Sequence, residues 1–184
     1  MLTIHVPAIE LFDSGKQEFI NEDAVTLELE HSLVALSKWE AKWEKPFLGP
    51  KEKSTEETLD YIRAMTLTPN VPPEVYLRLS NENFKQINDY ITSNMSATWF
   101  TDRAKGGSPM RNEIITAEII YHWIIALTIP LEFETRHLNQ LFTLIKVCNE
   151  KNNPDKKKQK MTRDDLAERN KINAERKAKM QSAG

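Results

Sequence analysis

The chain has few of the residues on which many catalytic and metal sites are built. Its 184 residues include one cysteine and five glycines. A single cysteine excludes an internal disulfide, falls far short of a zinc cluster, and is typical of a protein in a reducing compartment. The sequence contains no glycine-rich phosphate loop, no dinucleotide-binding fingerprint and no GxSxG nucleophile motif. These absences argue against the nucleotide-binding and hydrolase classes that use those motifs.

Long apolar runs are also missing. No segment approaches the roughly 18 consecutive apolar residues that a membrane span needs, and the first residues lack the basic and apolar stretches of a signal peptide. We therefore expect a cytosolic protein that is neither secreted nor membrane-spanning. Hydrophobic residues make up 40% of the chain and charged residues 28%. These proportions lie within the globular range, so the chain is expected to fold.

The formal net charge of −2 conceals two segments of opposite sign. Residues 1–149 contain 14 Lys/Arg and 21 Asp/Glu, whereas residues 150–184 contain 11 Lys/Arg and six Asp/Glu. The apolar periodicity also ends near Asn149. We therefore predict an acidic, mainly helical globular domain over 1–149, followed by a basic linker and a polar helical tail over 150–184.

The first thirty residues alternate apolar and polar side chains, which is the pattern of β-strands. Short apolar segments at 2–6 and 9–12 are followed by the turn sequence Asp-Ser-Gly-Lys at 13–16, then by a segment at 18–20 and alternation over 25–29. Aspartate, serine and glycine tolerate turn geometry. We predict a small N-terminal β-hairpin or sheet within about residues 2–30.

Beyond this region the apolar period lengthens to that of a helix, and Leu29, Leu33, Leu36, Trp39 and Trp43 fall on one helical face. The predicted fold class is therefore mainly α, with the small sheet at its N-terminus.

Further helices are predicted by their capping signals and apolar stripes. Ser54 and Ser80 stand at the predicted starts of two of them. The most hydrophobic segment, 112–128, predicts a central helix, and the next helix, 135–148, is expected to pack antiparallel to it. The glycines and charges of 101–110 predict an exposed loop between helices. A last helix, from Arg163 to about Met180, has few apolar residues and is marginal alone.

The histidines and the cysteine do not form a recognisable site in the sequence. His5, His31, His122 and His137 show none of the i, i+3 or i, i+4 spacings that bring two metal ligands onto one helical face. His122 and His137 could meet only if their two helices align. Cys148 falls on the apolar stripe of its helix, where cysteine acts as a small hydrophobe. We predict no catalytic residue, no metal site, no cofactor and no enzymatic activity.

Binding to another macromolecule is the class that remains. Trp39 and Trp43 lie one helical turn apart, so they either close the core or anchor a partner protein. The basic tail mixes its arginines with acids and lacks interleaved aromatic residues, which argues against nucleic acid and leaves a solvated helix or a protein-binding arm. The partner-binding candidates are Trp39, Trp43, Leu166, Arg169, Ile172 and Arg176.

Several segments resemble a family of small proteins encoded by tailed bacteriophages. The resemblance is carried by LEHSLVALSKWE at 29–40, WEKPF at 43–47, EIITAE at 113–118, RHLN at 136–139 and the basic stretch 169–177. Members of this family are often assigned as tail assembly chaperones.

The resemblance implies a non-enzymatic protein in the host cell cytoplasm that keeps the long tape-measure protein soluble until tail-tube subunits replace it. It also implies that a C-terminal extension, here residues 161–180, binds that client. Two alternatives stay open: a virion structural protein of the neck or tail, and a nucleic-acid-binding regulator. The expected partners are the tape-measure protein or another tail protein, with self-association in addition and no membrane.

Overall fold

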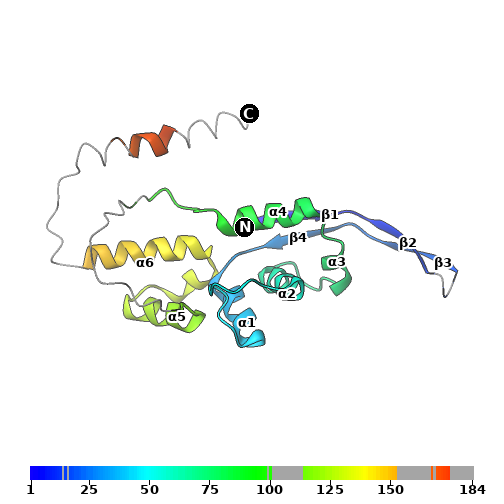
Figure 1. The fold of residues 1–184 in the computed structure, drawn as a ribbon, viewed down its shortest axis with the longest axis horizontal. Coiled ribbons are helices and arrows are strands. Elements are labelled where there is room, and N and C mark those ends of the chain that lie inside the picture. The colour runs from blue at the N-terminus through cyan, green and yellow to red at the C-terminus, as the bar shows by residue number, and fades with distance from the viewer. Residues whose placement is uncertain are drawn as a thin grey trace.

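The computed structural model describes residues 1–13, 15, 17–98, 100, 114–152, 167 and 169–174. Over these residues the chain is mainly α, and its strands are confined to the first thirty residues (Figure 1). The predicted fold class is therefore confirmed.

The N-terminal strands form two antiparallel pairs that follow one another along a single ribbon. The strands are β1 (Leu2–Val6), β2 (Ile9–Asp13), β3 (Glu18–Glu22) and β4 (Val25–Leu29). β2 pairs with β3 as the predicted hairpin, and β1 pairs with β4. Ile4, Val6, Leu27 and Leu29 expose none of their surface and alternate with exposed residues. The β1–β4 half thus faces the core on one side.

Helix α1 (Leu33–Trp43) begins one turn later than the apolar pattern suggested, because Leu29 ends strand β4. Ser32 caps the helix by accepting a hydrogen bond from the Ala35 N–H at 3.2 Å. Leu29 and Leu33 are both fully buried. The strand and the helix face the same core, so the apolar spacing of the helix continues across the boundary between them.

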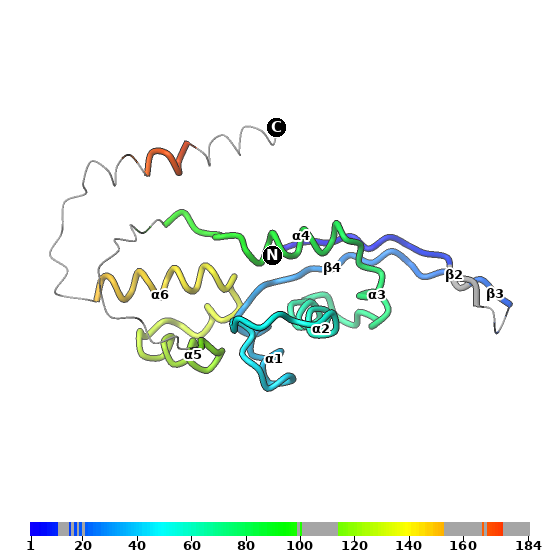
Figure 2. Tube along the Cα trace, viewed as in Figure 1, coloured from blue at the N-terminus to red at the C-terminus, as the bar shows by residue number. Residues whose placement is uncertain are grey.

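The middle of the chain holds α2 (Thr55–Met65), α3 (Pro73–Leu77) and α4 (Asn81–Thr92). Ser54 forms a capping box with Glu57, and Ser80 forms one with Asn83, which confirms both predicted helix starts. The tube in Figure 2 shows α4 running beside β1, with which it is in contact, while α1 packs on α2.

The last part of the body contains α5 (Ala117–Ala126), the short 3₁₀ helix η1 (Leu131–Thr135) and α6 (Leu138–Asn152). The prediction of a helix over 112–128 was too long, since residues 114–116 are not helical and the residues before them lie outside the described part. α5 packs on α1, whereas α6 approaches η1 more closely, so the predicted antiparallel pairing with α6 is not the main contact of α5. The predicted loop 101–110 lies outside the described residues.

Glu40 explains where α5 begins. Its buried carboxylate accepts hydrogen bonds from the backbone N–H groups of Phe47 and Ala117, both at 2.7 Å. A carboxylate stabilises the N-terminus of a helix because it meets unpaired N–H groups and the positive end of the helix dipole. The acceptor comes from α1, so the start of α5 is fixed by another helix.

The structure extends α6 to Asn152, three residues past the predicted domain boundary at Asn149. Beyond it, residues 169–174 are helical, within the helix predicted from Arg163 to about Met180. The remainder of that predicted helix lies outside the described residues, apart from the helical residue 167.

Arg78 holds the point at which the β2–β3 half of the ribbon leaves the body. Its guanidinium donates hydrogen bonds to the carbonyls of Pro7 at 3.3 Å and Asp23 at 3.2 Å, and forms an ion pair with Glu22 at 3.3 Å. Pro7 lies between β1 and β2, and Asp23 lies between β3 and β4. One side chain therefore joins both connections of the ribbon.

We expect Arg78→Ala to loosen this half of the ribbon, because a two-stranded hairpin is marginally stable by itself. Amide hydrogen exchange within 9–22 should become about tenfold faster, with little change in the global free energy of unfolding. Arg136→Ala, at an exposed position on another part of the surface, is the control and should leave exchange in the ribbon unchanged. Equal exchange in Arg78→Ala and in the native chain would contradict the assignment.

Candidate functional site

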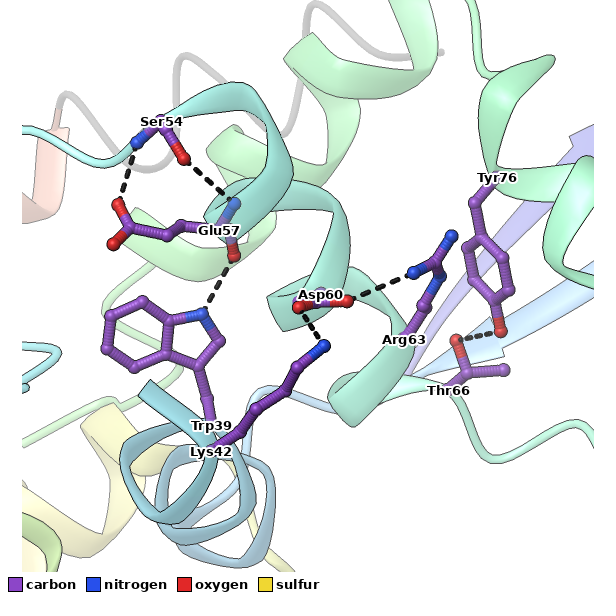
Figure 3. A network of polar contacts seen from close by, with 8 residues as sticks. All are labelled: Trp39, Lys42, Ser54, Glu57, Asp60, Arg63, Thr66 and Tyr76. Carbon is purple, nitrogen blue, oxygen red and sulfur yellow. Dashed lines mark hydrogen bonds and ion pairs between the residues drawn. The ribbon is translucent and has the colours of Figure 1, made fainter. Parts of the chain in front are cut away.

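The region between α1 and α2 contains a network of polar contacts around Glu57 (Figure 3). The Glu57 carboxylate accepts a hydrogen bond from the Ser54 N–H at 2.8 Å and forms an ion pair with Lys45 at 2.6 Å. Its backbone carbonyl accepts the indole N–H of Trp39 at 2.8 Å. The Lys45 hydrogen bond, followed by that from Ser54, holds the pKa of the Glu57 carboxyl below its usual range. Glu57 thus caps α2 and joins it to α1.

A second set of contacts lies one turn further along α2. Asp60 forms ion pairs with Lys42 of α1 and with Arg63 on its own helix. Burial raises the pKa of the Asp60 carboxyl, but the hydrogen bonds and charges of its two partners outweigh burial, so the net pKa lies below the usual range. The Tyr76 hydroxyl donates to Thr66 at 3.1 Å and extends the network toward α3. These groups hold helices together.

A pocket of about 320 Å³ opens beside this network, near the lower end of the volume range of ligand pockets. It is lined by Trp39, Lys45, Pro46, Gly49, Pro50, Lys51, Glu52, Lys53, Glu57 and Ile114.

The lysines of the pocket are not equivalent. Lys45 is paired with Glu57, whereas the Lys53 ammonium lies 4.3 Å from the centre of the Phe47 ring. Burial lowers the pKa of Lys53. The pocket therefore combines mainly apolar walls with three lysines and two glutamates, of which Lys45 and Glu57 neutralise each other.

The two predicted tryptophans lie in different environments. Trp39 is 3% exposed, and Phe47 packs edge-on against its ring with the ring centres 5.0 Å apart. Trp39 therefore belongs to the core, and its indole N–H is satisfied inside the protein. Trp43 is half-buried, with the ammonium groups of Lys42 and Lys45 within 5.6 Å of its ring centre. Trp43 therefore keeps more surface for a partner than Trp39, which contributes only to the wall of the pocket.

The four predicted binding residues of the tail are only partly described. Arg169 is exposed and Ile172 is half-buried within the helical residues 169–174. Leu166 and Arg176 lie outside the described residues. In the described part of the chain, no hydrogen bond or ion pair joins Arg169 or Ile172 to Trp39 or Trp43, and the binding role of these residues stays a prediction.

The structure pairs two histidines that the sequence did not connect. His31 and His137 are each 3% exposed, and their ring centres lie 5.1 Å apart. The Leu138 N–H donates to the His31 carbonyl at 2.7 Å, which joins the start of α6 to the residues before α1. His122, which could have met His137 only if their two helices aligned, is exposed on α5.

Both buried histidines are arranged to stay neutral. His31 Nδ1 lies 2.6 Å from the Tyr61 hydroxyl, and burial, together with the nearby His137, lowers the pKa of His31 to about 4. His137 Nε2 lies 3.1 Å from the Tyr90 carbonyl, and its Nδ1 accepts the Asn139 N–H at 3.3 Å. These contacts fit an imidazole that donates from Nε2 and accepts at Nδ1. Burial also lowers the pKa of His137.

The tyrosines of this cluster are also engaged in contacts within the protein. Burial raises the pKa values of Tyr61 and Tyr90. The Tyr90 hydroxyl donates to Glu30 at 2.7 Å. Each of these polar groups has a partner within the protein, so the cluster connects the N-terminal region, α2, α4 and α6. No spacing rule in the sequence could have found it. The one shared signal is that His31 and His137 both stand just before a helix.

Comparison of the chain with protein-family models, with curated proteins and with solved structures gave no match. The resemblance to the phage family therefore stays a prediction from the sequence. Within the described residues, no group of three or more His, Cys, Asp and Glu side chains is placed to hold a metal ion. None of the described helices is long and apolar enough to cross a membrane.

Proposed function

We propose that this protein is a non-enzymatic tail assembly chaperone of a bacteriophage, which binds the tape-measure protein in the host cell cytoplasm. The location of its basic residues carries the proposal. Residues 1–149 are acidic overall, whereas the segment 150–184 has 11 Lys/Arg. Arg169 and Lys171 are exposed in the described helical part of that segment. Such a segment can bind a long helical client through many shallow contacts.

The distribution of polar contacts supports a binding role for the tail. The groups with shifted pKa values at the α1–α2 junction and in the histidine cluster are engaged in contacts that hold helices together. Strong pKa shifts also arise from such structural networks. The surface that binds the client therefore lies outside these networks. The C-terminal segment is the largest basic segment of the sequence.

Co-expression with the neighbouring tape-measure product tests the proposal. The full chain should keep that product in the soluble fraction, and a chain ending at Asn152 should not. The shortened chain retains α6 and all the hydrophobic core residues that are buried in the described part of the chain. If the tape-measure product stays insoluble with the full chain, or if both chains act alike, the tail is not a client-binding segment.

A point substitution gives the sharper comparison. Ile172→Asp should reduce the soluble fraction of the client, because Ile172 is the half-buried apolar residue of the helical stretch 169–174. Asn173→Asp places the same charge at the next, exposed position and is the matched control. Equal loss in the two variants would indicate a charge effect and no specific contact of the isoleucine.

The basic segment also keeps nucleic acid as a second candidate function. Binding to DNA should weaken steeply with salt, since it releases counterions from phosphates. Retention on DNA that falls with salt, without retention on tape-measure fragments, would favour the regulator. Stoichiometric presence of the chain in purified particles, measured by mass spectrometry, would favour the structural protein of the neck or tail.

A further inference from the structure

The β2–β3 half of the ribbon and the residue after it form an arm, residues 9–23. Figure 1 shows it projecting beyond the helices at one end of the molecule. Among the described residues no third strand pairs with β2 or β3. As far as the described chain goes, each strand therefore has one edge of backbone N–H and C=O groups that an added segment could pair with.

The arm is acidic and carries exposed apolar side chains. Its sequence contains five Asp/Glu and one lysine. Glu10 and Asp23 are exposed, as are Phe19 at 66% and Ile9 at 40%. A two-stranded hairpin of this kind is marginal in water and gains stability when a third segment covers it. A basic segment with some apolar residues is the matching partner.

The C-terminal segment 150–184 of the same chain has that composition. It contains 11 Lys/Arg and apolar residues such as Leu166 and Ile172. The C-terminal end of α6, from which the segment departs, lies at the opposite end of the long axis from the arm (Figures 1 and 2). A second copy of the chain can place its C-terminal segment beside the arm of the first copy without crossing the length of the molecule. Two arms that paired with each other would bring like charges together, which is unfavourable.

We propose that copies of this chain associate head to tail, with the C-terminal segment of one copy bound to the arm of the next. The charges favour the encounter, and the open strand edges and exposed apolar residues provide the contact. Such an interface joins two different surfaces, one from each copy. Each added copy therefore offers a new binding surface, and assembly continues until a ring closes or an open filament stops growing. This inference does not rest on the chaperone proposal.

Sedimentation velocity of the full chain at low and high salt tests the head-to-tail association in the absence of any client protein. The native chain should form larger species as its concentration rises, and these should dissociate in salt. Glu10→Lys with Glu18→Lys on the arm should weaken association about tenfold or more, as should Lys156→Glu with Lys157→Glu and Lys158→Glu on the tail. Glu56→Lys with Glu132→Lys makes the same charge change at exposed body positions outside the pocket and should have little effect.

Mixing the arm variant with the tail variant is the decisive measurement. In this mixture the tail variant supplies a native arm and the arm variant supplies a native C-terminal segment. The two variants should therefore form pairs, although each associates only weakly alone. A native chain that stays monomeric at low salt overturns the proposal, and so does a body variant that weakens association as much as the arm variant. An arm variant that associates like the native chain also overturns it. Client solubility is measured separately, so either proposal can fail alone.

Discussion

Glu40→Ala should lower the free energy of unfolding by about 3 kcal/mol, because it removes the acceptor of two buried backbone N–H groups. The Glu40 carboxylate accepts from Phe47 and Ala117, so its loss leaves both donors without a partner in the protein. α5 should then fray at its first turn. Urea denaturation measures the free energy, and amide exchange at Ala117 reports the fraying.

Glu40→Gln separates the charge from the geometry of this contact. An amide has one acceptor oxygen and an NH₂ group that would face one of the two N–H donors. We expect about half the loss seen with alanine, with one donor still bound. Glu52→Ala, at an exposed loop position, is the control and should change stability by less than about 0.5 kcal/mol. A stability of Glu40→Ala within that same margin would contradict the role of Glu40.

The folded protein should lose about 2 kcal/mol of stability between pH 7.5 and pH 5 through His31 alone. Its pKa is about 4 in the folded protein against an ordinary value of 6.5. The unfolded chain therefore binds a proton at pH 5 that the folded chain does not. The stabilisation is fully present above pH 6.5 and is lost as pH falls toward 4. His137, whose pKa is also lowered by burial, changes stability in the same direction.

Denaturation curves at pH 7.5 and pH 5 measure this loss. The carboxyl groups with lowered pKa values, Glu57, Asp60 and Glu118, lose their stabilising contribution mainly below this pH window, so they interfere little. His31→Asn keeps a polar side chain near Tyr61 but cannot titrate, so the difference between the two pH values should shrink. His122→Asn, at an exposed position, should retain it. An undiminished difference in His31→Asn would assign the effect to other groups.

Local features of the sequence predicted the strands and the capped helices well. The β2–β3 hairpin follows from period-two alternation and turn residues between two short segments. The starts of α2 and α4 follow from Ser54 and Ser80, whose partners lie three residues away. In each case the stabilising contact joins residues close in the sequence, so the pattern contains the information.

The errors arose where the deciding contact comes from a distant part of the chain. Ile114 and Ile115 continue the apolar pattern of α5, but the helix starts only at Ala117, where Glu40 supplies the acceptor from 77 residues away. Ile114 is 51% exposed in consequence. The meeting of His31 and His137 is equally non-local. Trp39 could be assigned to the core only once its N–H was seen to reach the Glu57 carbonyl.

The contact between the residues before α1 and the start of α6 has a consequence for the order of folding. The His31 carbonyl is paired with the Leu138 N–H, and Ser32 forms a bridge with His137. During synthesis His31 leaves the ribosome long before Leu138. The early helices must therefore assemble while the position that α6 later occupies is still open to solvent. Long-range closure of this kind is a slow step. A nascent chain that stops before Leu138 should remain protease-sensitive even though its ribbon and its helices α1 to α5 are complete.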